Sequence, residues 1–595
     1  MKILLACTTI EDGHRDETNQ DSHYPLGLAY LQSYLEKHRP NKDQFVNLFL
    51  NNVDYPTCFK TLEKQFKEFQ PEVVGISIMT HSRVSAFKII EHLHDNYPHI
   101  KIVIGGMHAS VLYEQLAKHY PYVIVVRGEG ERTLHSLIEA WEKGESIADI
   151  RGLAYADGED IHITPQAELI DDLDELPFPK HSLFVKDGKR MANLLTSRGC
   201  PFKCNFCVLD ALSRRMVRFR SGENIADEVE LLLKTYPSIS TIWIHDDAFM
   251  IHRARTLEFC DSIINRGIKT QFIASARFRP INKEVVHKMK EAGFVQVLFG
   301  LESGAAEVMK VFNKGIGKDD VRYGQKLFAE VGVKVTAFLI AGLPGETDET
   351  VEETIDFIQE IQKLKYLFYD DIGVALIYPG TDIYRDVKLR GGLDDDFWLS
   401  DAPVPYYTTE YGGTESLEKL MEWKQTMREG IALKYMFNSP KAFLRQRKLI
   451  PEIIRYGVRF PDAGLQPLIQ QVIQKYGEEF VNDLVSNFLL GDTEGLRKTF
   501  ASVCEDLIAS QIEGTMTSED KNQFRLRLED QIAKDEKILK DFILKSEHIT
   551  VEDWNPNRGS NANLVADLPK ISSAGGTSMN SEEATYLVNE SGKQF

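Results

Sequence analysis

The first part of the chain alternates short apolar runs with longer amphipathic segments. The runs contain few polar residues, which is typical of strands buried on both faces of a parallel sheet. They are Lys2–Cys7, Phe45–Leu50, Val73–Ile78, Lys101–Ile104 and Val123–Val126. Amphipathic stretches such as Leu26–Glu36 and Val84–Asn96 lie between them. We therefore predict a doubly wound, Rossmann-like α/β domain over residues 1–142, with its ligand beyond the carboxyl ends of the strands.

A connector over residues 143–190 follows this domain. Gly152–Pro165 carries Asp157-Gly158 between residues of alternating polarity, and this pattern predicts a small β-hairpin. Acidic residues and prolines then crowd into the sequence DDLDELPFP, which ends at Pro179. We predict a domain boundary in this stretch.

The alternation of strand-like and helix-like segments resumes between Ala192 and about Arg385. Its candidate strands are Ala192–Ser197, Thr241–Ile244, Thr270–Ser275, Val295–Gly300, Lys334–Ile340 and Ile372–Ile377. A closed TIM barrel needs eight βα units. The smaller number found here predicts an open, partial (β/α)6 barrel over residues 191–388.

The pattern changes beyond about residue 390, where no strand alternation is found. Segments such as Glu415–Tyr435 and Leu465–Leu489 have the pattern of helices. We therefore predict an α-helical region over residues 389–550. Residues 551–595 include NPNRGSNAN and SSAGGTSMNSEE, whose low hydrophobicity predicts a disordered tail.

Composition narrows the functions that remain. The chain has 595 residues, of which 43% are apolar and 27% charged, as in ordinary globular proteins of about three domains. Its net charge of −19 argues against nucleic acid as the main partner, because phosphate binding needs clustered Lys and Arg. No apolar run is long enough for a transmembrane helix. The apolar start MKILLAC is too short for a signal peptide, so we expect a cytoplasmic protein.

The chain contains seven cysteines, which do not form the dense pattern of a disulfide framework. Four of them are scattered, and we expect them to be buried as small apolar residues. These four are Cys7, Cys58, Cys260 and Cys504.

The other three cysteines form the strongest chemical signal, Cys200-Pro-Phe-Lys-Cys204-Asn-Phe-Cys207. Thiolates suit zinc and iron–sulfur centres. A structural zinc site needs four ligands, and no second CxxC or HxxxH lies nearby, so zinc would need a remote ligand. A [4Fe–4S] cube held by three cysteines leaves one iron open to bind a substrate or cofactor. The motif therefore favours an iron–sulfur cluster, with zinc as the alternative.

This segment resembles the signature of the radical S-adenosylmethionine (SAM) superfamily, CxxxCxxC just after the first barrel strand. Here Asn193–Ser197 corresponds to that strand, and Arg198-Gly199 leads into the cluster loop. The resemblance implies that SAM chelates the open iron and is cleaved to methionine and a 5′-deoxyadenosyl radical. The electron for that cleavage would come from a donor such as flavodoxin or ferredoxin.

Motifs at the ends of later strands resemble the same family in the same order. They are His245-Asp246-Asp247-Ala248-Phe249, Arg277, Gly300-Leu301-Glu302-Ser303-Gly304, Gly342-Leu343-Pro344-Gly345-Glu346 and Tyr378-Pro379-Gly380-Thr381. The resemblance implies that Asp246 or Asp247 accepts from the SAM amino group and that Arg277 pairs with its carboxylate. The SAM-binding residues so implied are Phe206, Asp246, Asp247, Arg277, Glu302, Ser303 and Gly342. Helix capping by an aspartate, a surface arginine and ordinary turns are the alternatives.

The N-terminal domain resembles the cobalamin-binding domain that precedes many radical SAM barrels. The motifs that carry this resemblance are Tyr24-Pro-Leu-Gly-Leu-Ala-Tyr-Leu31, Gly75-Ile-Ser-Ile78, Gly105-Gly106 and Gly128-Glu129-Gly130-Glu131. The cobalamin-binding residues it implies are Ser77, Thr80, His81, Gly105, Gly106, His108, Gly128 and Glu129. Glycine pairs that only turn strand into helix are the alternative.

One motif departs from the usual cobalamin pattern. The DxHxxG signature supplies a histidine below the cobalt, but Asp12-Gly13-His14 is followed by Arg-Asp-Glu and no glycine. We therefore do not assign His14 as a ligand. His81 or Arg83, after the third strand, is a candidate for the lower side of the cobalt.

The resemblance implies a cobalamin-dependent radical SAM enzyme, most simply a methyltransferase. It would methylate an unactivated carbon of a small molecule or secondary metabolite through methylcobalamin and the 5′-deoxyadenosyl radical. A second hypothesis is a cyclase or rearrangement enzyme that uses both cofactors without methyl transfer. A third is a non-catalytic cobalamin sensor, which would leave the cysteine motif unexplained.

Overall fold

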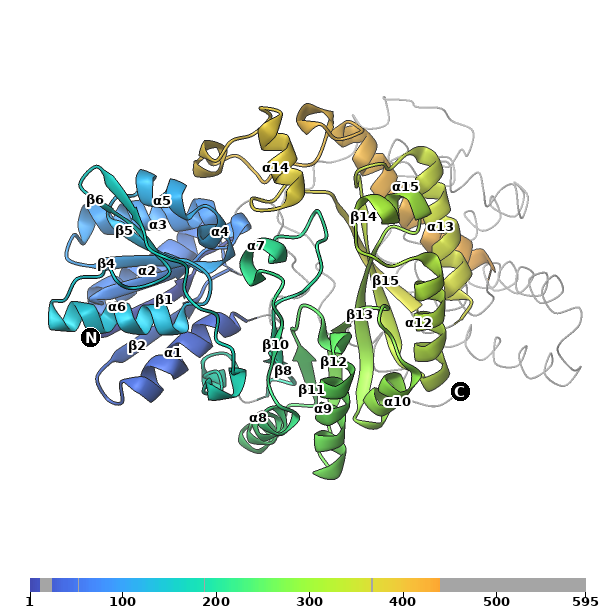
Figure 1. Cartoon of the computed structure of the whole chain (residues 1–595), viewed down its shortest axis with the longest axis horizontal. Coiled ribbons are helices and arrows are strands. Elements are labelled where there is room, and N and C mark those ends of the chain that lie inside the picture. Colours follow the sequence, from blue (N-terminus) through green and yellow to red (C-terminus); the bar gives the residue numbers. More distant parts are fainter. Residues whose placement is uncertain (11–23, 52, 187, 365–366, 439–595) are drawn as a thin grey trace, which may run out of the picture. The chain divides into compact units, whose positions relative to one another are not determined.

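The computed structural model describes residues 1–10, 24–51, 53–186, 188–364 and 367–438 (Figure 1). The chain divides into two compact units, Met1–Met427 and Arg428–Phe595. The predicted helix Leu465–Leu489 and the predicted disordered tail lie outside the described residues.

The N-terminal domain is built on one sheet with the strand order β2-β1-β3-β4-β5-β6-β7. The first five strands are parallel: β1 (Lys2–Cys7), β2 (Gln44–Phe49), β3 (Val73–Ser77), β4 (Lys101–Gly105) and β5 (Val123–Val126). Their apolar sequences predicted them, because both faces of the sheet are covered. The predicted hairpin is confirmed as β6 (Leu153–Asp157) and β7 (Asp160–Ile163), which extend the sheet antiparallel from β5.

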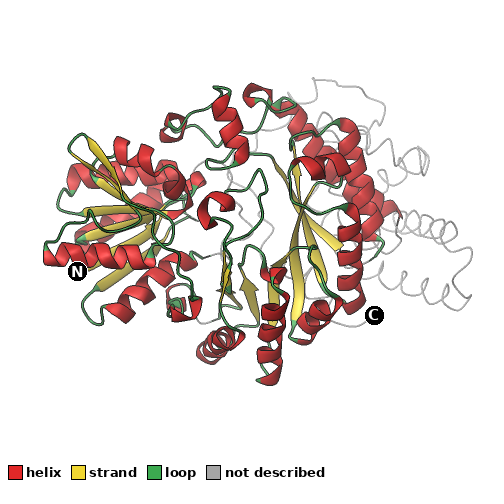
Figure 2. Cartoon of the chain, in the orientation of Figure 1, coloured by secondary structure: helices red, strands yellow, loops and turns green. Residues whose placement is uncertain are grey.

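Helices lie on both faces of this sheet (Figures 1 and 2). They are α1 (Leu26–His38), α2 (Tyr55–Glu68), α3 (Arg83–Asn96), α4 (Gly106–Val111), α5 (Tyr113–His119) and α6 (Glu131–Lys143). Leu28 and Leu35 of α1 and Leu134 and Leu137 of α6 pack in one core cluster with the apolar strand residues, such as Ile3. This core confirms the doubly wound α/β prediction.

The second domain is a half-barrel with the strand order β15-β14-β13-β12-β11-β8, parallel throughout. The strands are β8 (Met191–Leu194), β11 (Thr241–Ile244), β12 (Gln271–Ala276), β13 (Phe294–Glu302), β14 (Lys334–Ala341) and β15 (Leu367–Val374). The open sheet predicted from the sequence is confirmed. The last strand begins before the predicted Ile372–Ile377, because the polar pair Asp370-Asp371 interrupts its apolar run.

Helices cover the outer side of the half-barrel, as Figure 1 shows for α9, α12 and α13. In chain order the helices of this region are α7 (Leu209–Ser213), α8 (Gly222–Thr235), α9 (Arg253–Asn265), α10 (Lys283–Glu291), α11 (Ala306–Val311), α12 (Lys318–Val331), α13 (Asp348–Gln362) and α14 (Asp382–Leu389). The helix predicted near residue 415 is α15 (Leu417–Asn438). Side-chain caps begin several of them, for example Ser221 at α8 and Thr347 at α13.

A short antiparallel hairpin stands at the carboxyl end of β8. It consists of β9 (Ser197–Arg198) and β10 (Arg218–Phe219), in which Arg198 lies opposite Arg218. Residues 199–217 between the two strands contain the three clustered cysteines. The hairpin therefore closes the base of the cysteine loop.

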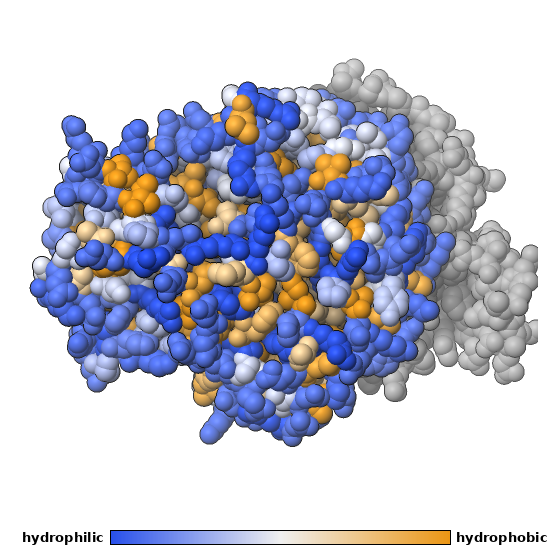
Figure 3. Space-filling model, viewed as in Figure 1, coloured by the Kyte–Doolittle hydropathy of each residue, from blue (hydrophilic) through white to orange (hydrophobic). Residues whose placement is uncertain are grey.

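Apolar side chains are scattered among polar ones on the face drawn in Figure 3. Among the described helices, none combines the length and the apolar character that crossing a bilayer requires.

Candidate functional site

The cysteine loop is tied to the half-barrel at several points. The Asn205 side chain donates to the carbonyl of Val311 at 3.1 Å, and the Asn313 side chain donates to the carbonyl of Lys203 at 3.2 Å. The backbone N–H of Ile383, in α14, donates to the carbonyl of Asn205 at 3.1 Å. The loop is thus held between the end of α11 and the start of α14.

Gly199 lets the chain turn from β9 into this loop. Its φ is +94°, and a Cβ built on it would overlap the carbonyl oxygen of Met216. A residue with a side chain would clash here. It would also have to adopt a positive φ, which is unfavourable for any residue other than glycine.

The three thiols are half-buried, and burial raises the pKa of each of them, that of Cys207 to about 11. The cations Arg277 and Lys314 act in the opposite direction on Cys204, where they favour the thiolate that binds metal. Within the described ranges, no three His, Cys, Asp or Glu side chains surround one point as a metal site would. The loop still supplies the soft donors and the compensating cations that an iron–sulfur cluster needs.

Arg277, which the resemblance assigns to the SAM carboxylate, lies against the cysteine loop. Its guanidinium carbon is 3.4 Å from the ring centroid of Phe202, and its Nε donates to the carbonyl of Arg279 at 3.0 Å. Burial lowers the pKa of this guanidinium, and the neighbouring Cys204 opposes that effect. Phe206, also predicted to contact SAM, makes an edge contact with Phe312 at 6.0 Å between ring centroids.

The acidic pair after β11 divides into two different environments. Asp246 is buried, and its carboxylate accepts from the backbone N–H of Thr196 at 2.6 Å and from the N–H and hydroxyl of Ser197 at 3.0 and 2.7 Å. The hydroxyl of Thr196 and the guanidinium of Arg255 complete its shell. Asp246 therefore fixes the chain that leads into the cysteine loop.

Asp247 is exposed at the same edge of the sheet. The surrounding protein and the charge of Asp246 raise its pKa to about 6, although the backbone N–H of Gly199 favours the carboxylate. It also acts electrostatically on Cys200 and Cys207. Of the pair, Asp247 is the carboxylate available to a ligand beside the cysteines.

The motif at the end of β13 contains an unusual backbone. Glu302 has a φ of +66°, where the register between β13 and β14 shifts, and its carboxylate pairs with Nζ of Lys314 at 2.8 Å. Ser303 is fully buried and its hydroxyl lies 3.0 Å from that of Thr354 in α13. Ser303 therefore holds the turn against α13, while Glu302 stands at the strand end. No motif in the sequence indicated the role of Lys314.

The loop after β14 is also stabilised by a hydrogen bond within the loop. Gly342 has a φ of +84°, and its N–H donates to the carboxyl group of Glu346. Glu346 is buried, its second oxygen Oε1 has no hydrogen-bond partner among the described residues, and burial raises its pKa to about 7. Leu420 of α15 packs against Gly342. The motif suggested Gly342 as a contact but did not indicate Glu346 as its support.

In the N-terminal domain, the ends of β3 and β4 approach each other closely. Gly106 has a φ of +91°, and a Cβ there would meet the backbone of Ile78 at 2.8 Å and the hydroxyl of Ser77 at 3.0 Å. Gly105, just before it, ends β4 in extended conformation. The glycine pair thus brings Ser77 and the end of β4 together at the edge where a ligand is expected.

Thr80, His81 and His108 lie beside this edge. His108 is buried, burial lowers its pKa to about 3, and its Nδ1 is 3.3 Å from the Thr80 hydroxyl. Its Nε2 has no partner in the part of the chain that the structure describes. His81 is half-buried, and its Nε2 lies 2.7 Å from the hydroxyl of Tyr378. His81 thus connects the N-terminal domain to the Tyr-Pro-Gly-Thr motif.

Arg83, the other candidate for the lower side of the cobalt, is fully buried. Its Nε donates to the carbonyl of Trp398 at 3.2 Å, and its Nη2 donates to the carbonyls of Ala402 and, at 3.4 Å, Ser400. These contacts give Arg83 a structural role between α3 and the segment after the half-barrel.

The predicted cobalamin residues Gly128 and Glu129 have different surroundings. Gly128 is exposed, and its N–H donates to the hydroxyl of Ser110 at 2.9 Å. The carboxylate of Glu129 pairs with Arg218 at 2.9 Å and with Arg198 at 3.3 Å. Glu129 therefore pairs with both arginines of the hairpin at the base of the cysteine loop. The sequence did not indicate this contact.

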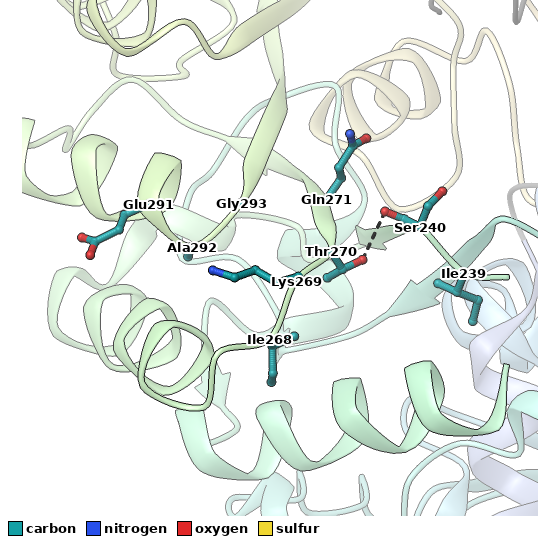
Figure 4. A pocket seen from close by; sticks show the side chains of 9 residues that line it. All are labelled: Ile239, Ser240, Ile268, Lys269, Thr270, Gln271, Glu291, Ala292 and Gly293. Carbon is teal, nitrogen blue, oxygen red and sulfur yellow. Dashed lines mark hydrogen bonds between the residues drawn. The ribbon is translucent and has the colours of Figure 1, made fainter. Parts of the chain in front are cut away.

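A hollow of about 430 Å³ lies at the amino ends of β11, β12 and β13 (Figure 4). The hydroxyl of Thr270 donates to the carbonyl of Ser240 there at 3.2 Å. In parallel αβ barrels the ligand sites lie at the carboxyl ends of the strands. The hollow is thus on the opposite edge from the cysteine loop.

Two family models match the chain. Residues 194–358 match the model described as the radical SAM superfamily, and residues 17–138 match the model described as the B12 binding domain. The two matched ranges fall on the half-barrel and on the N-terminal sheet.

Curated relatives match more than half of the chain. The uncharacterized methyltransferase PH0819 of Pyrococcus horikoshii is 30% identical over 431 residues, which cover 71% of this chain and 91% of the relative. The anaerobic magnesium-protoporphyrin IX monomethyl ester cyclase of Cereibacter sphaeroides is 30% identical over 344 residues, covering 56% of this chain and 55% of the cyclase. The solved structure of the cobalamin-dependent SAM radical enzyme OxsB, with aqua-cobalamin and SAM bound, has a TM-score of 0.58 at 18% identity. It covers 90% of this chain and 83% of that one, which shows a shared fold.

Proposed function

This chain belongs to the family of cobalamin-binding radical SAM proteins, and on that premise we propose that it is a cobalamin-dependent radical SAM methyltransferase. Its substrate is a small molecule that is methylated at an unactivated carbon. The observation that carries the proposal is the cysteine loop at the carboxyl edge of a half-barrel, in a chain that matches a methyltransferase over 91% of that relative's length.

We assign the cluster to Cys200, Cys204 and Cys207, whose thiol donors fit it and whose charge Arg277 and Lys314 would balance. When bound, the cluster supplies the electron that cleaves SAM, and cobalamin supplies a carrier for the methyl group. The protein's own task is to hold the two cofactors and the substrate in one geometry and to exclude water.

For SAM we propose a smaller set of contacts than the motifs alone implied. Asp247 would accept from the amino group, because it is exposed beside the loop, whereas Asp246 is fully engaged with Thr196 and Ser197. Arg277 would face the carboxylate, and Glu302 the ribose. Phe206 and Gly342 remain proposed contacts, and Ser303 is proposed to support them from behind.

For cobalamin we propose the carboxyl ends of β3 and β4 in residues 1–142. Gly105, Gly106 and Ser77 bring the backbone close to a ligand, and Thr80 and His108 stand beside them. The neutral His108 has a free ring nitrogen to offer. His81 and Gly128 remain proposed contacts, and Glu129 is excluded from our set because Arg198 and Arg218 hold it.

The cyclase reaction is the second candidate, since magnesium-protoporphyrin cyclases are among the relatives. We favour methyl transfer because the cyclase match spans only 55% of the cyclase, against 91% for the methyltransferase. A flavodoxin or ferredoxin is the proposed electron donor. We also propose a cytoplasmic location, because all described cysteines are free thiols, as in reducing compartments.

The test is anaerobic reconstitution with iron, sulfide and hydroxocobalamin, followed by metal analysis and assay of SAM cleavage. We expect about four irons and one cobalt per chain, since one cubane and one corrin would be bound. Deoxyadenosine release should require Cys204, so Cys204→Ala should abolish it while the variant stays folded. Substrate that gains one CH₂ unit per turnover supports methyl transfer, and oxidation or rearrangement without that gain supports the cyclase class.

A further inference from the structure

The loop Gly128–Glu131 of the N-terminal domain contacts the hairpin at the base of the cysteine loop. Arg198 and Arg218 lie directly opposite each other in that hairpin, one on each strand. Both side chains are largely buried, with 14% and 9% of their surface exposed. Two like charges placed across a strand pair repel each other, so the hairpin needs a counter-charge.

Glu129 supplies that counter-charge to both arginines. Its Oε2 lies 2.9 Å from Nη1 of Arg218, and its Oε1 lies 3.3 Å from Nη1 of Arg198. Glu131 adds a second carboxylate, 2.6 Å from Nη2 of Arg198. The four side chains form a neutral group, in which two carboxylates of the first domain meet two guanidinium groups of the second.

The connector between the domains joins the same group. The backbone N–H of Ile170 donates to Oε2 of Glu129 at 2.9 Å, and the Ile170 carbonyl accepts from Nη1 of Arg218 at 2.9 Å. Arg198 also stacks over the ring of Tyr30 in α1, at 5.1 Å from the ring centroid. The hairpin is thus bound to three separate parts of the chain.

We propose that Glu129 is a positioning residue for the iron–sulfur cluster. From the cobalamin-binding domain, its carboxylate holds together the two strands at the base of the cysteine loop. Arg198 ends β9 and is followed by Gly199 and Cys200, so its position sets where the loop leaves the sheet. The proposal rests on the proposed function for the cluster itself. Glu129 is thus assigned to the contact between the two domains and not to cobalamin.

The experiment compares Glu129→Gln with the double variant Glu129→Gln/Arg218→Gln. In the single variant the two arginines face each other without the carboxylate that both contact, and the loop base should open. In the double variant one of the two like charges is gone, and the two amide side chains keep an acceptor for the N–H of Ile170 and a donor for its carbonyl. Glu175→Gln is the control, because Glu175 forms an exposed ion pair with Arg132 between α6 and the connector.

The first readout is deuterium uptake of residues 199–217 in the metal-free full chain, which does not depend on cluster assembly. We expect Glu129→Gln to raise the exchange rate of this segment about tenfold, as expected for breaking a largely buried ion pair. The double variant and Glu175→Gln should exchange like the wild type. Unchanged exchange in Glu129→Gln, or no recovery in the double variant, would overturn the proposal.

The second readout is the rate at which a chelator removes iron from the reconstituted protein, measured beside the affinity for hydroxocobalamin. We expect faster iron loss in Glu129→Gln at an unchanged cobalamin affinity. Normal iron retention with weakened cobalamin binding would instead make Glu129 a cobalamin contact. A wild-type chain that assembles no cluster would contradict the proposed function. The exchange experiment would still test the contact between Glu129 and the hairpin.

Discussion

Lys314 donates a hydrogen bond from Nζ to Oε1 of Glu302 at 2.8 Å, and the same ammonium group also donates to the carbonyl of Gly300. Glu302 adopts a left-handed backbone conformation, which is unfavourable for a residue with a side chain. The ion pair therefore stabilises a strained strand end at the position where a SAM contact is proposed.

Replacing Lys314 with Met should destabilise the metal-free protein, because it leaves the Glu302 carboxylate largely buried without its partner. We expect a loss of about 2 kcal/mol, below the range for fully buried pairs since both groups keep some exposure. The matched control is Lys318→Met, whose more exposed pair with Glu353 should contribute less than about 1 kcal/mol. Calorimetric midpoints that fall equally in both variants would contradict this ranking.

The two aspartates after β11 should respond differently to the same substitution. Asp246→Asn removes a buried acceptor of several hydrogen bonds and should cost about 2 kcal/mol of stability. Asp247→Asn neutralises an exposed carboxylate whose pKa the fold raises, so it should not lower the melting temperature at neutral pH. It should weaken SAM binding to the reconstituted protein about tenfold, because an amide replaces a charged acceptor. Equilibrium dialysis with SAM and calorimetry together separate the two roles, and an Asp247→Asn variant with normal SAM affinity would refute the assignment.

Glu346 should make the protein less stable as the pH rises. Burial raises its pKa from 4.5 to about 7, so between these values the folded chain binds more protons than the unfolded chain. The free energy of unfolding must then fall as the pH rises through this window. The full loss, about 3 kcal/mol, is reached once the pH is above the folded pKa. Glu346→Gln, which stays neutral, should remove this slope and melt above the wild type at pH 8. Melting curves between pH 5 and pH 8 test it, and equal slopes in both proteins would exclude Glu346 as the source.

The strands β1 to β5 and most strands of the half-barrel were predictable because they are parallel and their sequences are largely apolar. β1, β5 and β11 agree with their predicted bounds for this reason. The start of β15 was missed because Asp370-Asp371 breaks the pattern that the rule depends on. The order of motifs along the half-barrel was also readable, since each follows a strand.

The partners of individual site residues could not be read from the sequence. Glu129 and Arg218 are 89 positions apart, and nothing local distinguishes an ion pair from a ligand contact. Asp246 and Asp247 are adjacent and chemically identical, yet the structure buries the first and exposes the second. Such assignments depend on the packing of distant elements, which a motif does not encode.

Gly199 is the position where the fold of the cysteine loop depends most directly on one missing side chain. Gly199→Ala places a Cβ on the Met216 carbonyl at a φ of +94°, so the β9–β10 base must open or shift. Gly267→Ala is the control, because Gly267 also has a positive φ of +66° but open space around its Cα. We expect the control to lose about 1 kcal/mol through backbone strain alone and to retain iron normally. Gly199→Ala should lose more stability and release iron faster, and equal behaviour of the two variants in calorimetry and iron retention would show that the steric contact is not what shapes the loop.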